Sequence, residues 1–412
     1  MTTPHAAQPA STVSLDDIRA AHDRIRSGIY RSPCPPSIPL SDLTGCRIWC
    51  KLDLLQRTGS FKERGARNAL LLLDAAERAR GVVAASAGNH ALGLSYHGRL
   101  LGIPVTVVMP RFAPLVKVAS CRRLGARVVL EGESFDDARA LAIEMADREG
   151  LNLVHGFDDP RVIAGQGTMA LEILDDVPDA EVIVVPTGGA GLLAGVATVA
   201  KALRPGIEII AVEPAAGGSL TASLAAGTPI KVPTRPTLAD GLAVGRVGSL
   251  AFSLAAPRID RVVTVGEEAI SLAILRLLEL EKTVVEGAAA AALAAVMGEQ
   301  GRALAGRKVV LLLCGGNIDL TILDRVIGHL RREPPKAAGG IARLAAALAE
   351  AGASVQQIVH DRTFSGPDVF VTSVEVTVET SDRDHVATVA KHLGDRGFTV
   401  TETTGPAAPD GG

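Results

Sequence analysis

The stretch "RTGSFKERGARNAL" (residues 57–70) places a single lysine, Lys62, between a polar turn and an apolar helical segment. We expect residues 58–60 to form a loop and residues 66–73 to form a helix, so Lys62 lies where neither a strand nor a helix is under way. A lone lysine is usually a solvated surface charge. When a lysine is desolvated or lies near other cations, its pKa falls and its amine becomes a nucleophile toward carbonyl groups. Lys62 is therefore either a surface charge or a reactive amine, and the chemistry of the neighbouring loops distinguishes the two interpretations.

A glycine-rich turn between an apolar strand and a helix, "PTGGAGLLAG" (residues 186–195), is typical of a phosphate site. Glycines let the backbone approach an anion. The first turn of a helix adds N–H groups without partners and the positive end of the helix dipole. The backbone groups expected at the phosphate are those of Gly188, Gly189, Ala190, Gly191 and Leu192.

Two other interpretations fit the same turn. The spacing of Gly189, Gly191 and Ala194 satisfies a dinucleotide-binding fingerprint, and Glu213 ends the next strand about 20 residues further on, as a ribose-binding acid does. An NAD-dependent oxidoreductase is therefore an alternative of another class. A turn that serves only close packing is the third interpretation.

Two further loops carry polar or reactive side chains. In "SAGNHALG" (residues 86–93), exposed N–H groups suit a carboxylate, and the residues expected to hold it are Ser86, Gly88, Asn89 and His90. The alternative is an ordinary helix cap with His90 in the core. In "LLLCGGN" (residues 311–317), Cys314 ends an apolar strand. No base stands beside it in the sequence, so a role as nucleophile is not expected.

The elements around these loops predict one architecture. Apolar strands alternate with helices over residues 47–314, which is the pattern of parallel sheets covered on both faces. Ligands in such folds lie at the carboxyl ends of the strands, where all four loops fall. A phosphate, a lysine amine and an amino-acid carboxylate at one sheet edge together indicate pyridoxal phosphate acting on an amino acid.

Composition excludes several functional classes. The chain has 412 residues, of which 47% are hydrophobic, enough for a sizeable core. Aromatic residues make up only 3%, and the net charge is -3 without a long basic run, so no nucleic-acid partner is expected. The five cysteines are irregularly spaced and the N-terminus has no apolar h-region, so a reducing, cytoplasmic location is expected.

One uncharged segment, residues 182–200, is long enough to cross a membrane. However, Pro186 and several glycines interrupt it. These residues favour a strand, a turn and a helix, so no membrane partner is expected.

The ends of the chain differ in character from its body. Residues 1–13 are expected to form a flexible arm. "RREPPKAAGG" (residues 331–340) predicts a linker. Helical and alternating runs over residues 341–403 predict a separate small α+β module, and residues 404–412 are expected to form a disordered tail.

Over residues 14–330 the chain resembles the serine/threonine dehydratases (threonine ammonia-lyases), a family of fold-type II pyridoxal-phosphate enzymes. The motifs that carry the resemblance occur in the family's order: "SFKERGARNAL", "SAGNHALG", "FDDPRVIAGQGTMALEI", "GGAGLLAG", "VEP", "LADGLAV", "VVEGAAAAAL" and "GGNID". The resemblance implies an α/β fold with two three-layer, parallel-sheet lobes of the tryptophan synthase β-like class. The small lobe, roughly residues 50–155, is inserted in the large one.

The C-terminal module resembles an ACT-like regulatory domain, with "GASVQQIVHDR" as the closest match. The first strand of such domains is missing here, because the linker replaces it. Allosteric control by an amino acid is therefore in doubt, while a dimer contact remains open. The resemblance implies a homodimer or homotetramer.

The resemblance also implies roles for single residues. Lys62 would bond covalently to pyridoxal phosphate and act as the general base. Phe61 would pack beside the ring, and Asn89 would hydrogen-bond the 3-hydroxyl. Cys314 would face the pyridine nitrogen, while the glycine-rich turn and the "SAGNHALG" loop would hold the phosphate and the substrate carboxylate. The residues that would line the pocket are Gly241 and Glu286.

The implied reaction is the conversion of L-threonine to 2-oxobutanoate and ammonia, with L-serine to pyruvate as a second activity. Within the same cofactor class, β-replacement or dehydration of a specialised β-hydroxy amino acid stays open. Ala87 stands where related serine racemases carry a serine base, so efficient racemisation is not expected.

Three departures from the family pattern bear on the site. Ala190 stands in the phosphate turn where glycine is usual, and Gly156 stands where proline is frequent. Glu213 matches a cation ligand of some relatives, but Ser219 replaces an acidic ligand. This replacement argues against a divalent ion and leaves room for a monovalent one.

Overall fold

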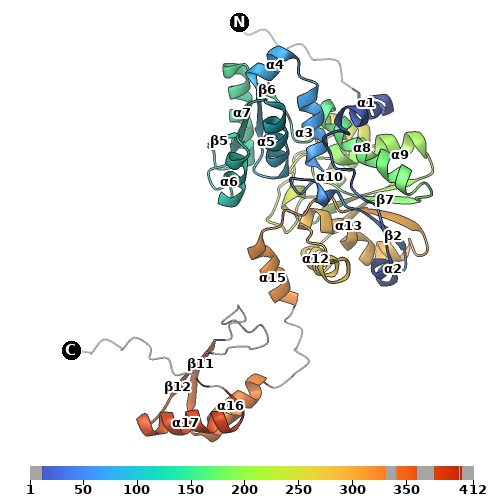
Figure 1. Cartoon of the computed structure of the whole chain (residues 1–412). Coiled ribbons are helices and arrows are strands. Elements are labelled where there is room, and N and C mark those ends of the chain that lie inside the picture. The colour runs from blue at the N-terminus through green and yellow to red at the C-terminus, as the bar shows by residue number, and fades with distance from the viewer. Residues whose placement is uncertain (1–11, 331–339, 360–374, 399, 401–412) are drawn as a thin grey trace. The chain divides into compact units, whose positions relative to one another are not determined.

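The computed structural model of the chain describes residues 12–330, 340–359, 375–398 and 400. The chain divides into two units, residues 1–329 and 330–412, each of which is described by itself (Figure 1). The predicted tail, and the predicted linker apart from residue 340, lie outside the described residues. The predicted arm extends too far, because Val13 is buried in the first unit.

A six-stranded sheet forms the larger lobe of the first unit. Its strands follow the order β1-β2-β10-β7-β8-β9, and all neighbours are parallel except the β1–β2 pair. The bounds are β1 (Pro36–Ser37), β2 (Arg47–Lys51), β10 (Lys308–Leu312), β7 (Val182–Pro186), β8 (Glu208–Pro214) and β9 (Arg261–Val265). Every residue of β7 is buried, as expected for a strand covered on both faces.

Helices cover both faces of this sheet. On one side α13 (Gly287–Met297) contacts β7, β8, β9 and β10, and α12 (Glu267–Glu281) packs on α13. On the other side α9 (Gly191–Leu203) contacts β7, and α8 (Pro160–Asp176) packs on α9 (Figure 1). The outer helices here are α1 (Leu15–Ile25) and α11 (Ser249–Ala255), and α2 (Ile38–Thr44) lies against α12 and α13.

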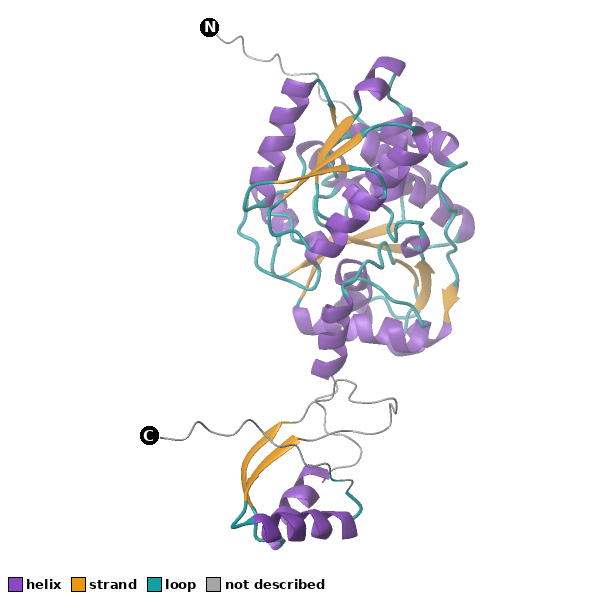
Figure 2. Ribbon diagram, turned by 60° about the vertical axis from the view of Figure 1, so that its left-hand side comes forward, coloured by secondary structure: helices purple, strands orange, loops and turns teal. Residues whose placement is uncertain are grey.

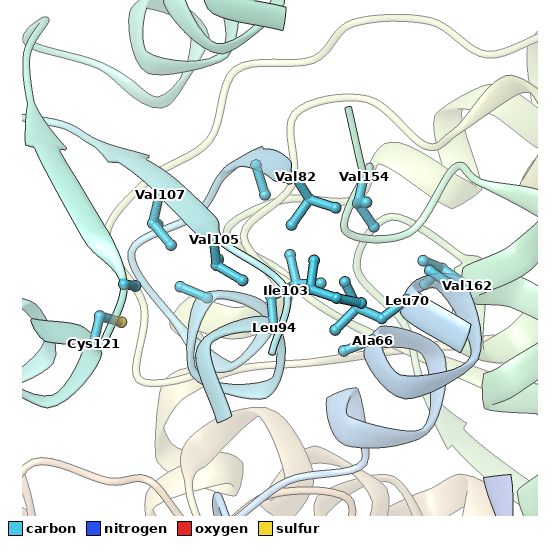
Figure 3. Packing of buried hydrophobic residues seen from close by; sticks show 14 of the residues in the cluster. Ala66, Leu70, Val82, Leu94, Ile103, Val105, Val107, Cys121, Val154 and Val162 are labelled. Carbon is cyan, nitrogen blue, oxygen red and sulfur yellow. The ribbon is translucent and has the colours of Figure 1, made fainter. Parts of the chain in front are cut away.

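A four-stranded parallel sheet forms the smaller lobe, in the order β5-β4-β3-β6. Its strands are β5 (Arg127–Leu130), β4 (Val105–Met109), β3 (Val82–Ala85) and β6 (Asn152–Leu153). Alternate side chains face opposite layers. Val82 packs in the core that α3 (Lys62–Leu71) and α5 (Asn89–Leu101) share (Figure 3), whereas Val83 packs against α7 (Phe135–Glu149). The predicted α/β class with two three-layer, parallel-sheet lobes is confirmed.

The helix that carries Lys62 begins earlier than the sequence pattern indicates. It runs over Lys62–Leu71 instead of residues 66–73, so Lys62 is the first helical residue and not part of the preceding loop. The cause is a tertiary contact. The Phe61 N–H donates to the carbonyl of Cys314, which fixes the turn and starts the helix one turn sooner.

Residues 182–200 form β7 and α9 with a turn between them, which confirms the strand–turn–helix interpretation. Among the described residues, no helix is long and apolar enough to cross a membrane.

The described part of the second unit contains two helices and an antiparallel strand pair (Figure 2). Its elements are α16 (Gly340–Glu350), β11 (Ser354–Val359), β12 (Glu375–Glu379) and α17 (Arg383–Asp395). Ala347, Leu348, Val389 and Leu393 form its core. The remaining elements of the described chain are η1 (Asp53–Leu55), α4 (Ala75–Arg80), α6 (Leu115–Arg123), α10 (Ser219–Ala226), η2 (Asp240–Leu242), α14 (Glu299–Arg302) and α15 (Leu320–Leu330).

Candidate active site

Two loops of the large sheet meet beside Lys62. The loops after β2 and β10 pair through an isolated bridge between Ser60 and Gly315. The Phe61 N–H donates to the Cys314 carbonyl at 2.9 Å. Because β2 and β10 are parallel neighbours, both loops leave the same edge of the sheet. The predicted proximity of Lys62 and Cys314 is therefore confirmed.

The Lys62 amine lies in a largely closed environment. Its Nζ donates to the carbonyl of Gly156 at 2.7 Å and lies 5.1 Å from the centroid of the Phe61 ring. Burial lowers the pKa of Lys62 to about 8, although the nearby Cys314 and Glu286 oppose this shift. A lysine with this pKa is partly neutral near physiological pH. This supports the reactive-amine interpretation over that of a surface charge.

The glycine-rich turn after β7 offers a row of free amides. Among the described residues, the backbone N–H groups of residues 188–192 donate to no acceptor, and α9 begins within this row. Phe157 explains two of the glycines. A Cβ on Gly189 would lie 2.3 Å from its ring, and a Cβ on Gly191 would lie 2.4 Å from its carbonyl oxygen. Free amides at a helix N-terminus fit a phosphate.

Ala190 adopts a left-handed backbone conformation, with φ 69°, in the middle of this turn. An L-residue with a Cβ is strained there, whereas glycine is not. Ala190, which stands where glycine is usual, therefore raises the conformational energy of the folded turn.

We expect Ala190→Gly to raise the free energy of unfolding by about 1 kcal/mol, because it removes this strain. The matched control is Ala194→Gly in the buried interior of α9, which should lower it by about 1 kcal/mol or more. Urea unfolding of both variants measures the difference. A loss of stability in Ala190→Gly would contradict the strain argument.

The loop after β3 presents a second row of free amides. The N–H groups of residues 89–91, at the start of α5, donate to no acceptor among the described residues, and the Gly88 N–H donates to Ser86 Oγ at 3.2 Å. Free amides at the N-terminus of α5 fit the predicted carboxylate.

The side chain of His90 does not belong to that site. It is buried, and its Nε2 lies 3.2 Å from the carbonyl oxygen of Val154. Burial, with a smaller contribution from Lys62, lowers the pKa of His90 to about 3, so the ring is neutral. The backbone N–H of His90 is free among the described residues, so the prediction that His90 helps to hold a carboxylate applies to that N–H group and stays a prediction.

A chain of side-chain amides connects the loops after β3 and β10. Asn317 Nδ2 donates to Asn89 Oδ1 at 2.9 Å, and Asn89 Nδ2 donates to the carboxylate of Glu286 at 2.9 and 3.1 Å. Glu286 therefore lies in the site, as expected. The role of Asn317 was not predicted, because an asparagine at a strand end carries no chemical signal until its partners are known.

Two other predicted residues, Cys314 and Gly241, adjoin the loops described above. Cys314 is buried, and burial raises the pKa of its thiol, which therefore stays protonated. The carbonyl of Gly241 lies only 3.0 Å from where a Cβ on Gly188 would be, so Gly241 adjoins the phosphate turn.

Glu213 caps a helix in this structure, and its predicted contact with a cation stays a prediction. Its two carboxylate oxygens accept hydrogen bonds from the N–H groups of Leu220 (2.9 Å) and Thr221 (3.1 Å), which caps α10. Among the described residues, no group of three or more His, Cys, Asp or Glu side chains could hold a metal ion. Glu213, the acid on which the NAD interpretation depends, therefore binds N–H groups at the start of α10.

The structure combines two lobes of parallel sheet, a lysine with a lowered pKa and a row of free amides that fits a phosphate. This combination is typical of the tryptophan synthase β-like class of pyridoxal-phosphate enzymes. Residues 25–315 match the family described as pyridoxal-phosphate dependent enzyme, so the chain belongs to that family. This membership excludes the NAD-dependent oxidoreductase as an interpretation of the glycine-rich turn.

Known proteins similar to the chain agree with this assignment. An L-threonine ammonia-lyase of Thermotoga maritima is 42% identical over 398 residues, covering 94% of this chain and 99% of that protein. A catabolic L-threonine dehydratase of Escherichia coli K12 is 41% identical over 319 residues, covering 77% of this chain and 97% of that protein. The structure of maize serine racemase is 34% identical, with a TM-score of 0.74, covering 78% of this chain and 99% of that one.

Proposed function

We propose that this chain converts L-threonine to 2-oxobutanoate and ammonia, and L-serine to pyruvate and ammonia. The observation that carries the proposal is the Lys62 amine, which is half-buried and donates at 2.7 Å to the carbonyl of Gly156. The next residue, Phe157, packs against the glycine-rich turn with its free amides. The similarity to the L-threonine ammonia-lyase of Thermotoga maritima, which extends over 94% of the chain, supports the choice of substrate.

The residues of the chain divide the work between them. Bound pyridoxal phosphate supplies an electron sink for the bonds at the substrate's α-carbon. The free amides of residues 188–192 would hold the phosphate, and those of residues 89–91 would hold the substrate carboxylate. Lys62 would hold the cofactor covalently between turnovers, and its amine would remove the α-proton during turnover.

Two residues favour elimination over competing outcomes. Cys314, whose buried thiol has a raised pKa, would face the pyridine nitrogen as a neutral group and, unlike a carboxylate, would not keep that nitrogen protonated. Ala87 has no group that could carry a proton to the opposite face of the substrate, so racemisation lacks a second base.

A substrate panel tests the proposal and its alternatives. We expect kcat/KM for L-threonine to exceed that for L-serine by about tenfold, because the burial of one additional methyl group contributes about that factor. Formation of 2-oxo acid from L-threonine, L-serine and bulkier β-hydroxy amino acids is the measurement. Faster turnover of a bulkier amino acid, or faster β-replacement with an added thiol, would establish one of the alternatives instead.

The second unit is proposed to be an ACT-like module at residues 341–403, on the strength of its helices packed on an antiparallel strand pair. The proposed assembly is a homodimer or homotetramer in the cytoplasm, with the catalytic part over residues 14–330. Light scattering of the purified chain tests the assembly.

A further inference from the structure

Glu286 is a buried carboxylate for which the proposed chemistry has no use. It stands at the N-cap of α13 and is only 7% exposed. Its backbone N–H donates to the Gly315 carbonyl at 3.1 Å, and a Cβ on Gly315 would lie 2.1 Å from its carboxylate. Within the described part of the chain, no lysine or arginine forms an ion pair with it. Burying a carboxylate without a cationic partner costs free energy of folding. The side chain that hydrogen-bonds to Glu286 therefore indicates what this carboxylate does.

That side chain is Asn89, and the surrounding contacts fix which way the Asn89 amide points. The two hydrogens of Asn317 Nδ2 go to the carbonyl of Thr58 (2.7 Å) and to Asn89 Oδ1 (2.9 Å). Asn89 Oδ1 must therefore face Asn317. Asn89 Nδ2 consequently faces Glu286, which accepts from it at 2.9 and 3.1 Å.

We propose that Glu286 is a positioning residue that orients Asn89 as a hydrogen-bond donor toward the ring oxygen of the bound cofactor. This role rests on the proposed function. Asn89 Nδ2 carries two hydrogens, and the two Glu286 oxygens can share one of them, which leaves the second for the cofactor. A carboxylate behind the amide polarises it and strengthens the remaining donor.

The same contact makes the site sensitive to pH. The charged or titratable groups that act on Glu286 are Lys62 on α3, Cys314 after β10, Asp240 in η2 and Lys117 on α6. Burial, against the hydrogen bond from Asn89, raises the pKa of Glu286 to about 7. As the pH falls below this value Glu286 gains a proton, and its hydroxyl competes as a donor where Asn89 needs an acceptor. The oriented state is therefore favoured above about pH 7.

The test uses the full chain and its affinity for pyridoxal phosphate. Glu286→Gln keeps an acceptor oxygen but cannot titrate, whereas Glu286→Ala removes the acceptor. Above the pKa of about 7, we expect Glu286→Ala to raise the Kd of the apoprotein for pyridoxal phosphate by about tenfold, the usual effect of one lost hydrogen bond to a charged group. We expect Glu286→Gln, which is neutral and carries a competing donor as protonated Glu286 does, to bind at every pH with the weaker affinity that the wild type shows below that pH. Glu144→Gln, at an exposed carboxylate, is the matched control.

Equilibrium titration across the pH range, together with the visible spectrum of the bound cofactor, gives the readouts. A wild-type pH profile in Glu286→Gln would overturn the role, and so would an unchanged affinity in Glu286→Ala. If Glu286→Ala does not fold, the pH profile of Glu286→Gln decides alone. A wild-type chain that binds no pyridoxal phosphate would overturn the proposed function and this role with it. Wild-type turnover combined with unaltered variants would overturn this role only.

Discussion

Lys62→Ala is expected to lower the rate of ammonia release from L-threonine by at least about 10³-fold, because it removes both the covalent anchor and the base. Among the described lysines, Lys117 on α6 also acts on Glu286, but its amine is engaged in an ion pair with Asp240 at 3.3 Å. Ammonia release and 2-oxo acid formation measured on the same sample give the rate.

The controls separate chemistry from folding. Lys231→Ala removes an exposed lysine that pairs with Asp136 and should leave the rate unchanged. Because burial depresses the pKa of Lys62, removing its amine relieves desolvation, so the far-ultraviolet circular dichroism of Lys62→Ala should match the wild type. Turnover within tenfold of the wild type would refute the assignment of Lys62.

The lowered pKa of Lys62 adds a second measurement to this test. Only the neutral amine attacks a carbonyl, and below the pKa of about 8 its fraction falls about tenfold per pH unit. The rate at which the apoprotein takes up pyridoxal phosphate should therefore rise with pH until about 8 and then level off. Borohydride treatment followed by peptide mass spectrometry should place the label on Lys62.

Much of the scaffold could be predicted because the pattern that indicates each long strand or helix lies in consecutive residues. Long apolar strands such as "EVIVVP" and "KVVLLLC" are buried on both faces, and this pattern is local. The strand β6 has only two residues, Asn152 and Leu153, which is too short for any periodicity to show. The sequence therefore predicts the large elements and their order but not the short edges.

The site could be predicted as a set of loops but not as a set of contacts. Lys62, the amides of residues 188–192 and Cys314 were placed by the rule that strand ends meet at one sheet edge. The neutral state of His90 depends on burial beside Val154, which lies 64 residues away in sequence. Contacts of this range carry no local signal, so the sequence could only leave His90 open between two interpretations.

Glu63 and Arg64, which follow Lys62, form buried polar contacts that stabilise the fold. Glu63 accepts a hydrogen bond from the Thr58 N–H and lies 3.1 Å from His97 Nε2. Arg64 is fully buried and ion-pairs with Asp53 and Glu172. The identity of these partners could not be predicted from the sequence. The ion pairs of Arg64 are expected to contribute strongly to the free energy of unfolding.

Arg64→Met is expected to lower the free energy of unfolding by about 3–5 kcal/mol, the usual cost of removing one member of a buried ionic cluster. The guanidinium forms four hydrogen bonds of 2.7–2.8 Å to the two acids, Asp53 and Glu172. Without it, Lys51, which lies 2.7 Å from Glu172, is the one remaining cation for two buried carboxylates in the described part of the cluster. The control is Arg148→Met, at an exposed pair with Glu144, which should change stability by less than about 1 kcal/mol.

The pH dependence distinguishes lost charge from lost packing. Arg64 holds the pKa of Asp53 and of Glu172 below their usual values. Their contribution to stability is therefore present above the unfolded pKa of about 4 and is lost as the pH falls through the folded values. In Arg64→Met the same carboxyls bind protons more readily, so the stability gap to the wild type should narrow on acidification. Urea unfolding at several pH values measures this gap. A gap that stays constant down to about pH 4 would mean that Arg64 stabilises the helix of Lys62 by packing alone.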